Sequence, residues 1–195
     1  YGLEPLTHTG VLASTSLSDN LSVSFGLANA FDSTADANGS IAGTGNFAYL
    51  VGVDITVPDS LGFLGGSNLY IGYASGADAG ADSDDDNKLL YVGGSISSPI
   101  EGVSLGIAYD DLESPNGPDQ DAVAIYALWD VSDGVSLATR YDTLDDGSDS
   151  KSMWSVTLGY SVWENVLTRL EYNYETGDRD DGDSTGFALN LFYQF

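Results

Sequence analysis

Hydrophobic and polar residues alternate along most of this chain. In the last nine residues, Phe187, Leu189 and Leu191 stand two positions apart, and the residues between them are mostly small or polar. A period of two places successive side chains on opposite faces of a β-strand. No apolar stripe with a 3.6-residue period is sustained, so the chain is predicted to be all-β. The alternation predicts eleven strands, near 9–16, 20–31, 47–57, 67–75, 88–97, 102–111, 121–131, 134–143, 152–162, 165–175 and 186–195.

The lengths of these segments and of their connections indicate a membrane barrel. Most segments have about 9–11 residues, the length that a tilted strand needs to cross a bilayer. The short connections pair an acid with Asn or Gly, which suits tight hairpins. They are 17–20, 99–102, 131–134 and 162–165, with 58–66 as a longer member. They alternate with long polar loops at 32–46, 76–87, 112–119, 144–150 and 177–184. Short turns on one side and long loops on the other are typical of outer-membrane barrels.

The two faces of a predicted strand differ in character. In the segment 152–162, Val156 and Leu158 share one face, and Ser155 and Thr157 share the other. A soluble sheet would bury the apolar face, whereas a membrane barrel turns it toward lipid and the polar face toward a wet lumen. Aromatic residues near strand ends, where membrane barrels carry girdles, favour the second arrangement. They are Tyr109, Tyr141, Tyr160, Trp163, Tyr172, Tyr174, Tyr193 and Phe195.

We therefore predict that residues 1–195 form one antiparallel, up-and-down transmembrane β-barrel domain. If the last strand ends at the periplasm, every long loop lies outside the cell and every short turn faces the periplasm. Eleven strands leave one edge unpaired, which is prohibitive in lipid. We expect at least one further strand before Tyr1, so that the chain is the C-terminal part of a larger, even-stranded barrel.

Composition narrows the partners and excludes several function classes. The chain has 30 acidic and 5 basic residues, a formal net charge of −25, which disfavours nucleic acid and favours cations near its surface. It has no Cys, so disulfides and thiolate metal sites are excluded. No apolar run approaches the roughly 20 residues of a membrane helix. The mean hydropathy of −0.07 is what alternating strands produce.

The first 32 residues carry a more specific signal. Residues 5–11, Pro-Leu-Thr-His-Thr-Gly-Val, resemble the Pro-Phe-Thr-His-Thr-Gly-Val motif of the OmpL-like β-barrel porin-2 family, with Leu6 in place of Phe. The segment 17–23 is similar to that family's next hairpin. Residues 29–32 depart from it, because Ala30 and Phe31 replace the commoner Gly and Trp. The resemblance implies an outer-membrane porin whose motif lies in mid-chain, and it implies no catalytic residues.

Charged residues on predicted polar faces are candidates for the pore lining. Opposed basic and acidic rows in a lumen would set a transverse field that selects permeants. Ion pairs that only brace the wall are the alternative. The candidates are Arg140, Asp142, Arg169, Glu171, Glu175 and, on the third strand, Asp54.

The long loops form an acidic mouth in this arrangement. Such a mouth would concentrate cations within about 8–10 Å; an acidic surface suited to a saline habitat is the alternative. Oxygen ligands also suit Ca²⁺, but Gly182 falls where an EF-hand loop needs a ligand, so the expectation is weak Ca²⁺ binding or a solvated loop. The loop acids are Asp84, Asp85, Asp86, Asp145, Asp146, Asp178, Asp180, Asp181 and Asp183.

No enzyme site is expected. His8 is the only His, and we expect it to make a structural contact in its loop motif. We find no phosphate loop, no nucleophile elbow and no carboxylate pair with catalytic spacing, and we expect no cofactor.

The sequence thus predicts a porin in the bacterial outer membrane that passes small hydrophilic solutes by diffusion and prefers cations. Its partners would be the lipid bilayer, its solutes and, by analogy with many porins, two further copies in a homotrimer. Two other functions stay open: a non-transporting scaffold that binds a surface layer through its acidic loops, and a soluble Ca²⁺-binding β adhesin.

Overall fold

The chain folds as one antiparallel meander of eleven strands. The structure is a computed structural model that describes residues 3–5, 8–31, 47–76, 86–115, 117–177 and 182–193. Each strand pairs with the next one in the chain, in the order β1 to β11. The strands are Gly10–Ser18 (β1), Leu21–Ala28 (β2), Ala48–Thr56 (β3), Asn68–Gly76 (β4), Asn87–Ser97 (β5), Val103–Glu113 (β6), Gln120–Ser132 (β7), Val135–Asp145 (β8), Ser150–Trp163 (β9), Val166–Gly177 (β10) and Ser184–Tyr193 (β11).

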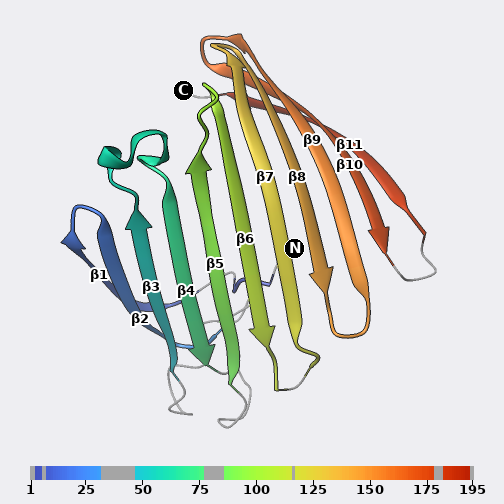
Figure 1. The fold of residues 1–195 in the computed structure, drawn as a ribbon. Coiled ribbons are helices and arrows are strands. Elements are labelled where there is room, and N and C mark those ends of the chain that lie inside the picture. The colour runs from blue at the N-terminus through green and yellow to red at the C-terminus, as the bar shows by residue number, and fades with distance from the viewer. Residues whose placement is uncertain are drawn as a thin grey trace.

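The sheet curves strongly but does not close (Figure 1). β1 pairs only with β2, and β11 pairs only with β10, so these two strands form opposite free edges. We call the end that carries the tight turns the turn end, and the opposite end the loop end. The connection between β3 and β4, at the turn end, contains a short 3₁₀ segment, Asp59–Leu64. Among the described residues, no helix is long and apolar enough to span a membrane.

Side chains and glycine fix the hairpins at the turn end. Asn20 follows β1, and its side-chain amide donates to the carbonyl of Thr56 at 2.9 Å, which ties the first turn to β3. Gly102 precedes β6 with a φ of 75°, a left-handed conformation that suits glycine. Its carbonyl accepts the N–H of Asp130 at 2.8 Å. The acid–Asn and acid–Gly turns thus act as the sequence predicts.

The apolar face of the sheet lies on its convex side and is open. Phe25 is 50% exposed, Leu158 is 44% exposed and Leu191 is 67% exposed. Leu21 and Val23 are half-buried. The described residues place no second layer over this face, so its leucines do not lie in a dry protein interior. The transmembrane barrel fold is the arrangement in which such a face is covered, by acyl chains.

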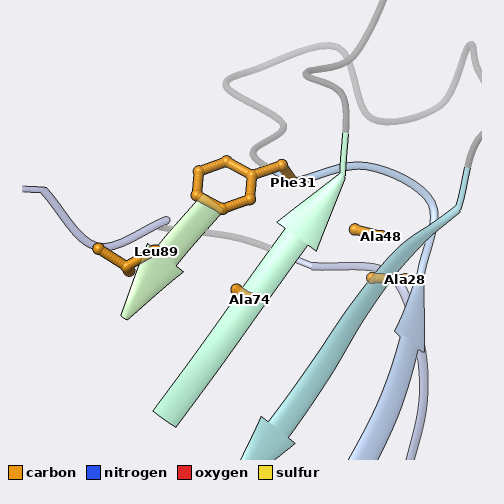
Figure 2. Close-up of a cluster of buried hydrophobic side chains, with 5 residues drawn as sticks. All are labelled: Ala28, Phe31, Ala48, Ala74 and Leu89. Atoms are coloured by element: carbon orange, nitrogen blue, oxygen red, sulfur yellow. The ribbon is translucent and has the colours of Figure 1, made fainter. Parts of the chain in front are cut away.

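The buried apolar core is small and lies on the concave side, near the loop end. It consists of Ala28, Phe31, Ala48, Ala74 and Leu89, drawn in Figure 2. Phe31 is the one aromatic ring among them, and three of the others are alanines on neighbouring strands. In this core Phe31, which follows β2, packs against the inner wall of the sheet. The core is therefore not formed by two sheets packed face to face.

The predicted strands differ from the observed ones mainly at their ends. The prediction carried the second strand to residue 31, but β2 ends at Ala28 because the chain then turns over the concave face. At the loop end, β6 reaches Glu113 and β8 reaches Asp145, since pairing with Lys88 and Asp121 continues that far. The predicted long loops 112–119 and 144–150 are therefore shorter, at 114–119 and 146–149.

The sidedness of the sheet predicts an asymmetric response to charge. Leu158→Arg should destabilise the membrane-folded state by about 2–4 kcal/mol, because it puts a guanidinium on the lipid face. Thr157→Arg, on the adjacent concave position beside Glu171, should cost far less. Urea titrations of folding in phosphatidylcholine vesicles, followed by Trp fluorescence, measure both. Equal costs for the two variants would contradict the assignment of the faces.

Candidate functional site

The concave face is a nearly continuous wall of small and polar residues with three adjoining hollows. The first hollow, of about 480 Å³, lies over β2–β5. The second, of about 230 Å³, lies over β5–β8, and the third, of about 400 Å³, lies over β7–β10. Tyr91 lines the first and second hollows, and Tyr126 lines the second and third. These three hollows lie on the face predicted to be polar, and a further hollow of about 330 Å³ lies on the convex face over β6–β9.

Two segments near the loop end fold inward onto this wall. The stretch before β1 crosses the concave face (Figure 1), where Glu4 lines the first and second hollows. The stretch after β2 brings Phe31 against Leu89 (Figure 2). His8 joins the two, because its Nε2 lies 2.8 Å from the carbonyl oxygen of Phe31. The predicted structural contact of His8 is confirmed, whereas the inward fold is a feature that the sequence alone did not reveal.

Backbone and side-chain bonds lock these two segments together. The N–H of Thr9 donates to Oδ1 of Asn29 at 3.1 Å, and the N–H of Asn29 donates to the carbonyl of Thr9 at 3.0 Å. His8 and Thr9 and the segment 29–31 are thus partners in one structural unit. Together they narrow the space along the inner wall at the loop end.

Arg140 and Asp142 stand two apart on β8 and form an ion pair on the concave face. Nε of Arg140 lies 2.7 Å from Oδ2 of Asp142. Asp142 is only 2% exposed, and its other oxygen, Oδ1, has no hydrogen-bond partner among the described residues. Both side chains line the second hollow. The pair thus braces the wall and leaves one carboxylate oxygen unused.

The candidates on β10 make separate contacts. Oγ1 of Thr157 donates to Oε2 of Glu171 at 3.0 Å. The guanidinium of Arg169 lies over the ring of Phe192, 4.9 Å from its centre. Phe192, the exception to the alternation in the last strand, therefore contacts an arginine on the concave face. Glu175 shares the face of Glu171 and pairs in register with Met153.

Charge is distributed unevenly around the wall. By register, the basic residues of the described concave face all lie on β8–β10: Arg140, Lys151 and Arg169. Lys88, on the convex face, pairs instead with Glu113 at 2.9 Å. Asp54, opposite Tyr70 in register, lies on the concave face of β3, away from the basic group. One side of the wall is therefore mixed in charge, and the other is acidic.

Three tyrosines lie against the wall over glycines. A Cβ at Gly106 would collide with the ring of its register partner Tyr126, and a Cβ at Gly93 would collide with the hydroxyl of Tyr91. Tyr70 lies in the same way beside Gly52, and its ring centre is 5.8 Å from that of Tyr91. Glycines that alternate with tyrosines on one face of a strand are the sequence signal that could reveal this arrangement. In β5 and β7 large and small residues occur on the same face, which obscures the signal.

Only part of the predicted acidic mouth lies within the described residues. Asp145 and Asp146 build the turn after β8: Oδ1 of Asp145 accepts the N–H of Gly147 at 2.8 Å, and Oδ1 of Asp146 accepts that of Asp149 at 2.9 Å. Asp183 accepts the hydroxyl of Tyr174 at 2.6 Å. Asp86 is exposed. Asp84, Asp85, Asp178, Asp180 and Asp181 lie outside the described residues.

A metal centre is not evident in the part of the chain that the structure describes. No three His, Asp or Glu side chains there are placed to hold one ion. Ca²⁺ binding by the loops stays a prediction.

Aromatic pairs mark the convex face toward the loop end. Tyr141 and Trp154 have ring centres 5.2 Å apart, and Tyr172 and Phe187 have ring centres 5.0 Å apart. Trp163 is exposed at the turn end of β9. Aromatic residues near both ends of the strands are typical of a barrel that is anchored at both membrane interfaces.

Comparison with known proteins agrees with this geometry. A model of the family described as "Putative beta-barrel porin-2, OmpL-like" matches residues 1–195. The chain belongs to this OmpL-like porin family. A search of curated proteins found no significant match. Membership of the family, together with the barrel fold, places the chain in the bacterial outer membrane.

Solved structures show the same fold. OmpT, an outer membrane protein of Vibrio cholerae, superposes with a TM-score of 0.65 at 16% identity over 94% of this chain and 63% of OmpT. The trimer form of OmpT gives a TM-score of 0.65 at 16% identity, over 95% of this chain and 64% of the OmpT chain. The KdgM porin in complex with disordered oligogalacturonate gives a TM-score of 0.47 at 11% identity, over 94% of this chain and 90% of the KdgM chain. This similarity is too low to support a structural conclusion. The OmpL-like chain thus spans less than two thirds of the OmpT chain.

The inward fold of this OmpL-like chain should contribute measurably to stability. Phe31 is 4% exposed, so Phe31→Ala should cost about 3 kcal/mol by removing the only ring of the small core. Phe47 precedes β3 and is 64% exposed, so Phe47→Ala should cost well under 1 kcal/mol. Urea unfolding in detergent compares the two. If both variants unfold like the unaltered protein, Phe31 does not anchor the inward segment.

Proposed function

We propose that this chain forms most of the wall of a passive diffusion pore that passes small hydrophilic solutes and prefers cations. The observation that carries the proposal is the hollowed, polar concave face behind an open apolar convex face. A water-filled lumen requires a wettable wall of this kind, and a bilayer requires the apolar surface. The family and the fold are those of channels, which supports a non-enzymatic role.

The charge distribution supports the cation preference. The chain carries a net charge of −25. On β3–β7 the described concave face bears Asp54, Asp110 and Asp130 without a basic residue. Opposite them, Arg140 and Arg169 stand among Asp142, Glu171 and Glu175. The electrostatic potential in the lumen would therefore be negative along one side of the wall and close to neutral along the other. Such a potential attracts cations and orients dipolar solutes.

The proposal includes closure of the barrel by further strands. β1 and β11 run in the same direction, because ten antiparallel pairings separate them. An odd number of additional strands is then needed for a fully antiparallel barrel. An unpaired strand edge in lipid costs several kcal/mol for each open backbone group, so closure is strongly favoured. We extend the proposal to a homotrimer, on the model of the OmpT trimer form.

Planar-bilayer recording tests the proposal. The reconstituted protein should give stable conductance steps, and in a KCl gradient its reversal potential should have the sign of cation selectivity. Conductance without cation preference would refute the selectivity. A folded, membrane-inserted protein with no conductance would refute the pore and favour a scaffold.

Removing basic side chains from the wall should increase cation selectivity. Arg169→Ala should move the reversal potential further toward that of K⁺, because it deletes a lumen cation while leaving the backbone register intact. Arg140→Ala should move it in the same direction, provided that circular dichroism shows an intact fold despite the loss of the Asp142 partner.

The matched control for these variants is Lys88→Ala, which removes a convex-face cation and should leave the reversal potential unchanged. If Arg169→Ala and Lys88→Ala behave alike, Arg169 does not face the permeation path.

A further inference from the structure

We propose that the wall carries a binding lane for linear organic cations, namely alkyl chains that bear two or more ammonium groups. The lane consists of the rings of Tyr70, Tyr91 and Tyr126 together with the carboxylates of Asp110 and Asp142. This inference deepens the proposed pore and rests on it. It names the class of solute that the inner wall would retain during passage.

The tyrosine rings form a stepped apolar surface along the wall. Tyr70, Tyr91 and Tyr126 come from β4, β5 and β7. A side chain at Gly93 or Gly106 would collide with Tyr91 or Tyr126, and the hydroxyl of Tyr70 lies close beside Gly52. One ring face is therefore held against the backbone. Tyr91 and Tyr126 connect the three hollows. Aromatic faces presented in this way attract methylene groups and cations.

Two carboxylates next to the rings each have one oxygen without a hydrogen-bond donor among the described residues. Oδ1 of Asp110 and Oδ1 of Asp142 are both buried without a partner among the described residues. Asp142 as a whole is 2% exposed, and both residues line the second hollow with Tyr91 and Tyr126. Buried acceptors without donors cost free energy, so the site favours a ligand that brings its own donors.

The spacing of the acids suits an extended ligand. Asp110 on β6 and Asp142 on β8 are separated by β7, which places their strands about 10 Å apart. Glu171 on β10 stands two strands further on and lines the third hollow. A chain of methylenes with ammonium groups at intervals can donate to successive carboxylates while its apolar stretches lie on the tyrosines. A small inorganic ion can reach only one of these acids at a time.

The sign of the charge separates this ligand class from neutral oligosaccharides. Sugars also stack on aromatic rings, and their hydroxyls can donate to carboxylates, but a neutral sugar brings no positive charge to balance these acids. Glu4 also lines this hollow, so that three acids, Glu4, Asp110 and Asp142, stand there against the one guanidinium of Arg140. Charge-assisted hydrogen bonds from ammonium groups are about twice as strong as neutral ones.

Isothermal titration calorimetry of the detergent-solubilised protein with spermidine tests the lane. Tyr91→Leu, Tyr126→Leu and Asp110→Asn should each weaken spermidine binding about five-fold or more. Tyr91→Phe should retain most of the affinity, since it keeps the ring. Because any one variant could disturb the fold, three independent positions are used, and circular dichroism verifies each.

The chain offers matched controls. Asp111→Asn removes the same charge one position along β6 but on the convex face, and Tyr160→Leu removes a convex tyrosine that is 53% exposed. Both should bind spermidine like the unaltered protein. The proposal is overturned if spermidine does not bind, if Asp110→Asn and Asp111→Asn have equal effects, or if maltotriose or Mg²⁺ binds with the same dependence on the tyrosines.

Bilayer recording distinguishes failure of the binding lane from failure of the proposed pore. Spermidine should produce transient blocks of the open current in the unaltered protein and fewer blocks in Tyr126→Leu. A cation-selective current that spermidine does not interrupt would overturn the lane and leave the pore standing. Calorimetric binding without any conductance would remove the pore and leave a surface-accessible cation site.

Discussion

The structure depends on one constraint: backbone N–H and C=O groups have no water to bond within a bilayer. A meander in which each strand pairs with the next satisfies almost all of them through local hairpins. Side chains then have two environments, lipid and lumen, and the alternation of the strand assigns each residue to one of them. The exposed leucines of the convex face and the small residues of the concave face both follow from this single requirement.

The concave wall shows how a lumen can be shaped without a conventional core. Glycines at Gly93 and Gly106 make room for tyrosine rings to lie flat, so the wall gains apolar surface without losing width. Phe31 and Leu3, which is 8% exposed, show that segments at the loop end fold inward rather than away. The pore that we propose would therefore be narrowed by the chain's own connections as well as by charged side chains.

Much of the fold could be predicted from the sequence, because period-two alternation and hairpin chemistry are local properties. The faces of β9 and the polar faces that carry Arg140 and Arg169 could be predicted, since apolar and polar residues alternate there without interruption. The faces of β5 and β7 cannot be predicted in this way, because large residues, Leu89, Tyr91 and Tyr126, lie on the concave face beside small ones. The inward fold of Phe31 and the support of Arg169 by Phe192 depend on contacts between segments far apart in the chain, which periodicity does not encode. The turn that Asp146 builds depends instead on hydrogen bonds to its near neighbours Ser148 and Asp149.

The central claim is that the sheet is apolar toward lipid and polar toward water. Single cysteines can test it cleanly, because the chain has no native Cys. Nitroxide labels at successive positions 154–159 of β9, in vesicles, would be probed with oxygen for lipid exposure and with a water-soluble nickel complex for lumen exposure. The account predicts strict alternation, with 154, 156 and 158 exposed to lipid and 155, 157 and 159 exposed to water. Loss of that alternation, or its reversal, would contradict the account.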